Sequence, residues 1–222
     1  MQSIKPKWIK RILVLFIVIF ISYILYLNSL VKSQFSSEIE PKNNVVQVQN
    51  LIDDYPKELI NMLLLVEDQS FFDHIGVDFK EIFRVLYGYL FEEKELRGAS
   101  TITQQLIKNT LLSSDKTLAR KTDEALMAIL MEMSYDKNFI LERYMNTVYL
   151  AQQGSTAIHG FASGSLHYFD KDVESLNLEE MATLVALLKG PSYYNPVNSP
   201  ERLSRRVEMI LSMHKNYKKI IQ

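Results

Sequence analysis

Hydrophobic and polar positions divide the chain into an uncharged N-terminal stretch, a polar connecting segment and a long region with helical periodicity. Ile12 to Val31 carries no charge, and Ser33 to Asp54 is polar apart from VVQVQ at Val45–Gln49, whose alternation predicts a short strand. Beyond Tyr55 apolar residues recur at helical spacing almost to the end. The pattern therefore predicts a mainly α domain behind an N-terminal transmembrane helix.

The uncharged stretch is long enough to cross a bilayer, because twenty residues in a helix span about 30 Å. Basic residues precede it, which predicts that residues 1–11 form a cytoplasmic tail, that 12–31 form a signal anchor, and that the rest lies outside. A cleaved signal peptide is the alternative. The length of the run and the lack of an A-x-A-like site near residues 28–37 favour an uncleaved anchor.

Residues 32–54 are predicted to be a linker and residues 55–222 one helical domain. A helix opened by Pro56 is expected to hold the apolar run that ends at Glu67. Asn177 and Glu180 have the residue types of a capping box. Breaks are expected at Gly98, Ser113–Lys116, Gly154 and Gly190–Pro196. The further predicted helices are Val77–Phe91, Ser100–Leu111, Thr117–Met133, Lys137–Tyr149, Thr156–Tyr168, Leu178–Leu188 and Pro200–Tyr217.

Composition narrows the classes of function. The formal net charge of the 222 residues is −1, which excludes a global basic field of the kind that attracts nucleic acid. Cysteine is absent, which excludes disulfides, thiolate metal sites and a cysteine nucleophile. The four histidines have no HxxxH or HxH spacing, which argues against a histidine-rich metal site.

An adjacent acid pair, Glu67 and Asp68, follows the apolar run Met62–Val66. Ionised carboxylates are costly to bury without partners. Apolar walls, the C-terminal end of the helix dipole and the neighbouring Asp68 would leave Glu67 ready to accept a proton as a general base. A surface acid pair at the end of a core helix is the alternative, and this stretch alone favours it.

Three further stretches carry polar residues in a pattern. Ser100, Gln104 and Lys108 recur every four residues and would share a helix face suited to a polar, anionic ligand, with Ile102 and Leu106 directed into the core. A solvated helix face explains them about as well. In KTLARKTDEALMAILME, the residues Lys116, Arg120, Lys121 and Glu124 form a local positive pocket suited to a pyrophosphate, with Leu126, Ile129, Leu130 and Met133 on the apolar side.

Ordinary ion pairing of Arg120 with Glu124 is the simpler reading of that pocket. In Lys137–Tyr149, Glu142 and Asn146 share a face, and a structural role in capping neighbouring segments is favoured over direct chemistry.

Together these stretches resemble the peptidoglycan glycosyltransferases of glycosyltransferase family 51, which includes the polymerase domain of class A penicillin-binding proteins and stand-alone monofunctional transglycosylases. ED-x-x-F-x-x-H-x-G is matched from Glu67 to Gly76, and G-x-STITQQ-x-x-KN from Gly98 to Asn109. RK-x-x-E is matched from Arg120 to Glu124, and K-x-x-ILE-x-Y-x-N from Lys137 to Asn146. The resemblance covers about residues 50–212.

The resemblance implies a two-lobed, lysozyme-like helical fold whose smaller lobe touches the membrane. It also implies polymerisation of lipid II into β-1,4-linked glycan with release of undecaprenyl pyrophosphate. Glu67 would be the general base and Glu124 the second catalytic residue, at the pyrophosphate. The implied substrate-binding residues are Asp68, Phe71, His74, Ser100, Thr101, Gln104, Lys108, Lys116, Arg120 and Lys121.

The resemblance makes no cofactor obligatory, although Mg²⁺ or Mn²⁺ near the pyrophosphate is compatible with it and Glu124 is then the candidate ligand. The implied partners are lipid II, the growing strand and the bacterial cytoplasmic membrane, with cross-linking penicillin-binding proteins and divisome or elongasome components as further candidates. Because the sequence stops at Gln222, a monofunctional enzyme is expected.

Four features depart from the family pattern: Lys116, Ala151, the SGS run Ser163–Ser165, and Asp170 in place of a usual glycine. Two alternatives therefore stay open. One is a membrane-anchored, non-catalytic cell-wall scaffold with a degenerate site. The other is a lytic, muramidase-like enzyme, which the cationic residues and the STITQQ motif disfavour.

Overall fold

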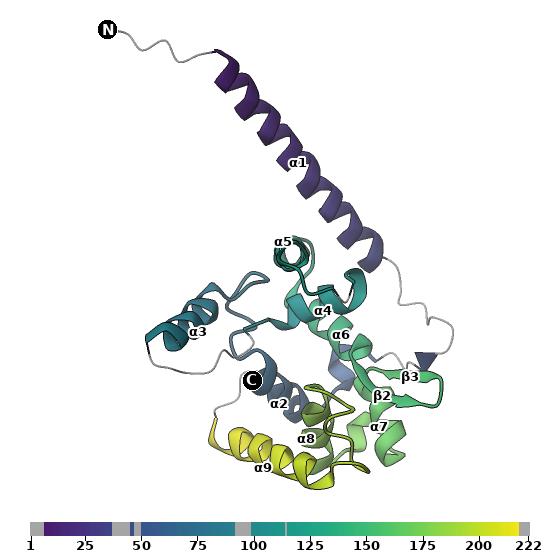
Figure 1. Ribbon diagram of the computed structural model, residues 1–222. Helices are drawn as coiled ribbons and strands as arrows, with labels where there is room; N and C mark the ends of the chain where they lie inside the picture. Colours follow the sequence, from purple (N-terminus) through teal and green to yellow (C-terminus); the bar gives the residue numbers. More distant parts are fainter. Residues whose placement is uncertain (1–6, 37–44, 47–49, 92–98, 114, 218–222) are drawn as a thin grey trace.

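The computed structural model describes residues 7–36, 45–46, 50–91, 99–113 and 115–217, and these are predominantly helical (Figure 1). The expectation of a mainly α fold behind an N-terminal apolar helix is confirmed. The helices are α1 (Lys7–Phe35), α2 (Lys57–Glu67), α3 (Phe79–Phe91), α4 (Ile102–Leu111), α5 (Leu118–Ser134), α6 (Lys137–Thr147), α7 (Phe161–Phe169), α8 (Leu178–Leu187) and α9 (Pro200–Asn216). Two 3-10 turns are η1 (Ile52–Asp54) and η2 (Val173–Ser175).

Helix α1 extends away from the domain and enters it only with its last turns (Figure 1). Its segment Trp8–Phe35 contains an 18-residue stretch with a mean hydropathy of 2.4, so the helix is long and apolar enough to cross a membrane. Leu27, Val31 and Phe35 are buried in the domain core, and the Tyr23 hydroxyl donates to Asp123 of α5. The helix thus continues four residues into the predicted linker, because this apolar stripe packs on the domain. Most of the predicted tail lies outside the described residues.

Helix α2 is the centre of the core and packs against α8 and α9. All seven residues from Leu59 to Leu65 are buried, including the polar Asn61. A helix that is apolar on every side belongs inside a domain. Pro56 occupies the N-cap position and Glu67 is the last helical residue, as the sequence predicted. The capping box of Asn177 and Glu180 at the start of α8 is also confirmed.

A small sheet borders the helices, with strand order β1-β3-β2. Strand β2 (Tyr149–Gln153) pairs antiparallel with β3 (Thr156–His159), and β1 (Val45–Val46) pairs parallel with β3. The short strand expected at Val45–Gln49 is confirmed at its first two residues, and its last three lie outside the described part. The helix expected over Thr156–Tyr168 is wrong at its start, because Gly160 turns the chain at φ +84° and α7 begins only at Phe161. Short apolar runs do not distinguish strand from helix by periodicity.

Helix α3 lies apart from the other helices (Figure 1), and Gly88 is the one residue of it that is buried. Its apolar side chains recur at helical spacing, yet Phe79, Phe83 and Leu90 are 64%, 69% and 59% exposed. The predicted amphipathic helix therefore forms, and its apolar face is open on the surface of the protein.

Helix α5 is rotated relative to the expectation. Its buried residues are Glu124, Met127, Ala128 and Met131, whereas Met133, expected on the apolar side, is 77% exposed. Leu126, Ile129 and Leu130 are only partly buried. The prediction failed because it placed a charged residue outside, while Glu124 is buried with two cationic partners.

Candidate active site

Glu67 lies where the central buried helix stops. Asp68, the C-cap residue of α2, has φ −162° and ψ 80°, so the chain leaves the helix directly after Glu67. The Glu67 side chain is half-buried, and its Oε2 accepts a hydrogen bond of 3.0 Å from Nε2 of Gln105. A carboxylate at this position is held by a rigid element on one side and remains accessible on the other.

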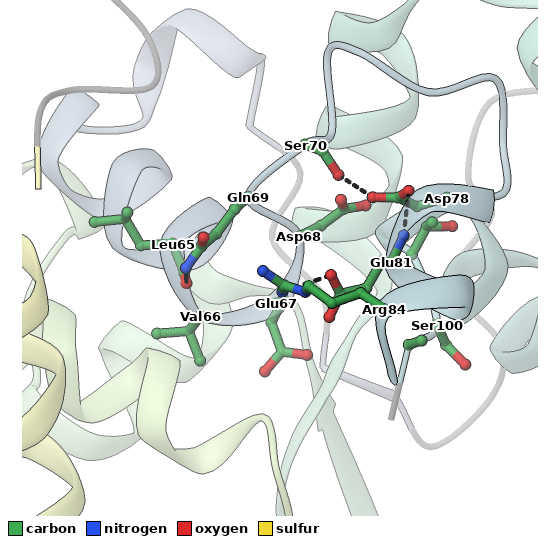
Figure 2. A pocket seen from close by; sticks show the side chains of 12 residues that line it. Leu65, Val66, Glu67, Asp68, Gln69, Ser70, Asp78, Glu81, Arg84 and Ser100 are labelled. Carbon is green, nitrogen blue, oxygen red and sulfur yellow. Dashed lines mark hydrogen bonds and ion pairs between the residues drawn. The ribbon is translucent and has the colours of Figure 1, made fainter. Parts of the chain in front are cut away.

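A polar cavity of about 160 Å³ opens beside Glu67 (Figure 2). One side consists of residues 65–70, and another consists of Ala99, Ser100 and Thr101 at the entry to α4. Asp78, Glu81 and Arg84, at the beginning of α3, complete the lining. In Figure 2 the Glu67 carboxylate points away from the pair formed by Ser70 and Asp78. The cavity thus joins the acid pair to the start of the STITQQ segment.

Asp78 is a fixed negative charge on this cavity wall. It accepts hydrogen bonds from the Ser70 hydroxyl and, at 2.9 Å, from the backbone N–H of Glu81. Partial burial acts to raise the pKa of Asp78, but these donors outweigh it and hold the pKa below its ordinary value. The Arg84 guanidinium pairs with Glu81, so the α3 side of the cavity holds two acids and one cation.

Asp68, unlike Glu67, is turned into the protein. Its Oδ2 accepts 2.9 Å from the backbone N–H of Ile102 and lies 3.0 Å from Nε2 of His74. A carboxylate at the first N–H groups of a helix satisfies donors that have no partner within the helix. Asp68 and His74 therefore join the loop after α2 to the start of α4.

Thr101 and Gln104 form a capping box at the start of α4. The Thr101 hydroxyl accepts from the Gln104 N–H at 3.1 Å, and Gln104 Oε1 accepts from the Thr101 N–H. Gln104 is only 2% exposed, and Phe71 is fully buried. Neither residue is among those that line the cavity beside Glu67, and their assignment to substrate binding stays a prediction. The proposed face of Ser100, Gln104 and Lys108 does not exist either, because Ser100 precedes the helix.

A second cluster surrounds Glu124, which is 1% exposed. Arg120 Nη1 lies 2.9 Å from its Oε2, and the Lys121 ammonium pairs with its Oε1. The same ammonium donates 2.9 Å to Oγ of Ser100, which lines the cavity beside Glu67. The ion pair expected from the i, i+4 spacing is therefore present, and the structure brings Ser100, Arg120, Lys121 and Glu124 together. Lys108 and Lys116 are exposed.

Gly76 connects the two clusters through the backbone. It has φ +86°, and a Cβ there would lie 2.5 Å from the carbonyl carbon and oxygen of Ala128, one turn after Glu124 on α5. The Gly76 carbonyl also accepts from the Thr101 hydroxyl at 2.6 Å. The loop that follows Glu67 is thereby pressed against the helix that carries Glu124.

Sequence reasoning missed Gln105 and gave Tyr144 no role beyond its place in a motif. Gln105 bonds Glu67 directly, and its Oε1 accepts 3.1 Å from the Tyr144 hydroxyl of α6. The only signal was the second glutamine of STITQQ, which lies one residue beyond the one that was chosen. Glu142 and Asn146 cap neighbouring backbone as predicted: Glu142 accepts from Ile52 N–H and Asn146 from Asn50 N–H, both at 3.0 Å.

A divalent cation held by the protein needs several oxygen or nitrogen ligands close together. Within the residues that the structure describes, no three His, Asp or Glu side chains gather in a way that could hold a metal. Glu124, the candidate ligand, has both oxygens occupied by cationic side chains. These residues do not fit a metal held by the protein alone.

Comparison with known proteins agrees with the motifs. The model of the family described as Transglycosylase matches residues 32–215. Penicillin-binding protein 1B of Haemophilus influenzae is 41% identical over 169 residues, which cover 76% of this chain and 22% of that protein. Penicillin-binding protein 1B of Escherichia coli (strain K12) is 43% identical over 159 residues, which cover 72% of this chain and 19% of that protein. Penicillin-binding protein 1A of Neisseria lactamica is 45% identical over 161 residues, which cover 72% of this chain and 20% of that protein.

The chain thus spans about a fifth of the length of these relatives. The family match covers the helical domain together with the end of α1, and its fold class is the lysozyme-like one expected from the motifs. On this match the chain belongs to the transglycosylase family.

Proposed function

We propose that the protein is a peptidoglycan glycosyltransferase that polymerises lipid II, with Glu67 as the general base. The observation that carries the proposal is a half-buried carboxylate at the end of a rigid core helix, opening on a polar cavity that leads to Ser100 and Lys121. The family match and the penicillin-binding relatives support the same reaction class.

In this reaction the 4-hydroxyl oxygen of the acceptor GlcNAc attacks C1 of the donor sugar. The bond between C1 and the pyrophosphate oxygen breaks, and the anomeric centre inverts to give a β-1,4 linkage. The hydroxyl proton passes to the Glu67 carboxylate, and undecaprenyl pyrophosphate leaves with the electron pair. A positioned general base supplies about 10²- to 10⁴-fold of rate.

The leaving pyrophosphate gains negative charge, which suits the second cluster. Arg120 and Lys121 together exceed the single charge of Glu124, so the cluster is net positive at a place connected to the cavity through Ser100. Fixed cations of this kind stabilise developing charge, which is often the largest contribution to catalysis. Glu124 holds the two cations in position. No step is assigned to a metal ion.

A lipid-linked substrate requires an enzyme at the membrane, and two apolar surfaces suit that location. Helix α1 qualifies as a membrane span, and the exposed apolar face of α3 borders the cavity through Glu81 and Arg84. Insertion of aromatic and aliphatic side chains into the headgroup region is favourable for such a face. The proposal places the protein in the bacterial cytoplasmic membrane as a single-pass protein, with its N-terminus inside and this domain outside. Cross-linking penicillin-binding proteins are its candidate partners.

The test is incubation of the detergent-solubilised full chain with purified lipid II, with and without Mg²⁺ or Mn²⁺, beside Glu67→Gln. Glycan polymer from the wild type and none from Glu67→Gln is the expected result. If added glycan strands were shortened instead, the protein would be a lytic enzyme. No polymer from the wild type, together with intact cell-wall function of Glu67→Gln in cells, would indicate a scaffold.

A further inference from the structure

Three side chains from three helices form a hydrogen-bonded chain that ends at Glu67. Tyr144 of α6 is 1% exposed, and its hydroxyl lies 3.1 Å from Oε1 of Gln105 on α4. Nε2 of Gln105 lies 3.0 Å from Oε2 of Glu67 at the end of α2. No role described above for the reaction uses Tyr144.

The direction of these bonds follows from which atoms can donate. Burial raises the pKa of Tyr144 well above its ordinary value, and the nearby charges of Glu67 and Asp68 act in the same direction. The hydroxyl therefore keeps its proton at neutral pH and can donate. The acceptor on a glutamine amide is its oxygen, so the Tyr144 hydroxyl selects the orientation in which the Gln105 amino group faces Glu67.

The opposite orientation would be unfavourable for a base. If the amide turned over, its oxygen would face the Glu67 carboxylate, and two acceptors without a proton between them repel each other. In the observed orientation one carboxylate oxygen, Oε2, is bound by Gln105. Within the part of the chain that the structure describes, the other oxygen has no hydrogen-bond partner and can accept from a substrate hydroxyl. The orientation of the Glu67 carboxylate is thus determined by a core residue, Tyr144, through two successive hydrogen bonds.

We propose that Tyr144 is a positioning residue of the transglycosylase reaction, which acts through the Gln105 amide to orient the Glu67 carboxylate. This inference rests on the proposed function of Glu67. Tyr144 has two separable properties: the ring fills the core between α4 and α6, and the hydroxyl alone reaches the active site.

Tyr144→Phe isolates the hydroxyl, because the ring remains. We expect kcat for lipid II polymerisation to fall about tenfold, as loss of one oriented hydrogen bond implies. KM should not change, since Tyr144 is 1% exposed and lies in the core.

Tyr55→Phe is the matched control. Tyr55 is 3% exposed, and its hydroxyl donates 3.0 Å to Oδ1 of Asn146, so the same atom is removed from an equally buried ring. Both variants should lose similar thermal stability, and Tyr55→Phe should keep the wild-type kcat and KM. In a Gln105→Leu background, Tyr144→Phe should cause no further loss of kcat, because its effect is transmitted by Gln105.

Two results would overturn the positioning role. One is a Tyr144→Phe variant with the same kcat as Tyr55→Phe, when the wild-type chain polymerises lipid II. The other is a double variant in which the losses of kcat multiply. A wild-type chain that makes no polymer would overturn the proposed function, and the positioning role with it.

Discussion

The two glutamates of the candidate site differ in what surrounds them. Glu67 ends a helix, is half-buried and accepts from a neutral amide. Glu124 lies within a helix, is 1% exposed and is paired with a guanidinium and an ammonium. Both oxygens of Glu124 are bound by cationic side chains, whereas one oxygen of Glu67 is bound by an amide and the other has no hydrogen-bond partner among the described residues. In the proposed function the same residue type therefore acts as the base at Glu67 and as an organiser of cations at Glu124.

This difference also bears on the departures from the family pattern. Lys116 is exposed and follows Asp115, whose carbonyl accepts from the Arg120 that pairs with Glu124. Asp170 ends α7 in the left-handed conformation at φ 54°. Aspartate tolerates that region better than most residues do. Ser165 is buried and donates 2.6 Å to the Lys171 carbonyl, so this polar departure has a partner. Ser165 and Asp170 belong to α7 and its C-terminal end, whereas Glu67 and Glu124 belong to α2 and α5, and this argues against the degenerate-site alternative.

The largest expected effect belongs to Glu67→Gln. The substitution keeps the shape and removes the proton acceptor, so polymerisation of lipid II should fall by about 10²- to 10⁴-fold. Thermal stability should stay within about 0.5 kcal/mol of the wild type, because the side chain is half-buried and pairs with one amide. Polymerisation kinetics and thermal unfolding in detergent measure the two quantities. Retention of more than about a tenth of the activity would remove Glu67 from the role of base.

Gly76→Ala should disturb both glutamates at once. The new Cβ would lie 2.5 Å from backbone atoms of Ala128, and φ +86° is strained for alanine. We expect a loss of about 3 kcal/mol or more in the free energy of unfolding. Gly154→Ala is the control: it has φ +59° and nothing within 4 Å of its Cβ, so only the conformational cost of about 1 kcal/mol remains. Equal losses in the two variants would contradict the contact between the loop and α5.

Glu124→Gln should lower stability more and activity less than Glu67→Gln does. It breaks two ion pairs of a buried carboxylate, but Arg120 and Lys121 are 17% and 45% exposed and remain hydrated. The expected stability loss is therefore about 1–2 kcal/mol, lower than for a fully buried pair. Activity should fall about tenfold, since both cations remain but are less well placed. A rate loss as large as that of Glu67→Gln at unchanged stability would show that Glu124 takes part in the chemistry.

Much of this comparison was accessible from the sequence. The apolar run of α2 and the Asp68 that stops it placed Glu67 correctly, because one helix contains the whole signal. The strand at Thr156–His159 was missed, since its apolar spacing also fits a helix turn. Gln105 and Tyr144 were missed for another reason. The hydrogen bonds Gln105–Glu67 and Tyr144–Gln105 join residues 38 and 39 positions apart, and periodicity carries no information on such contacts.

Substitution of Asp78 should have the smallest effect on stability and activity, because its carboxylate has different hydrogen-bond partners from those of Glu67 and Glu124. Its pKa is lowered in the folded protein, so its contribution to stability is fully present above the unfolded value near 4 and is lost as pH falls through the folded value. Asp78→Asn should therefore cost less than about 1 kcal/mol at pH 7 and make unfolding less dependent on pH below about 4. Thermal unfolding between pH 3 and 7 measures this, with the exposed Asp73→Asn as control.

Because Ser70 and the Glu81 N–H already occupy the Asp78 oxygens, polymerisation near pH 7 should not depend on this carboxylate as a base. If Asp78→Asn lost as much activity as Glu67→Gln, the cavity would hold two proton acceptors. The contrast between the accessible Glu67 carboxylate and the hydrogen-bonded Asp78 carboxylate would then not hold.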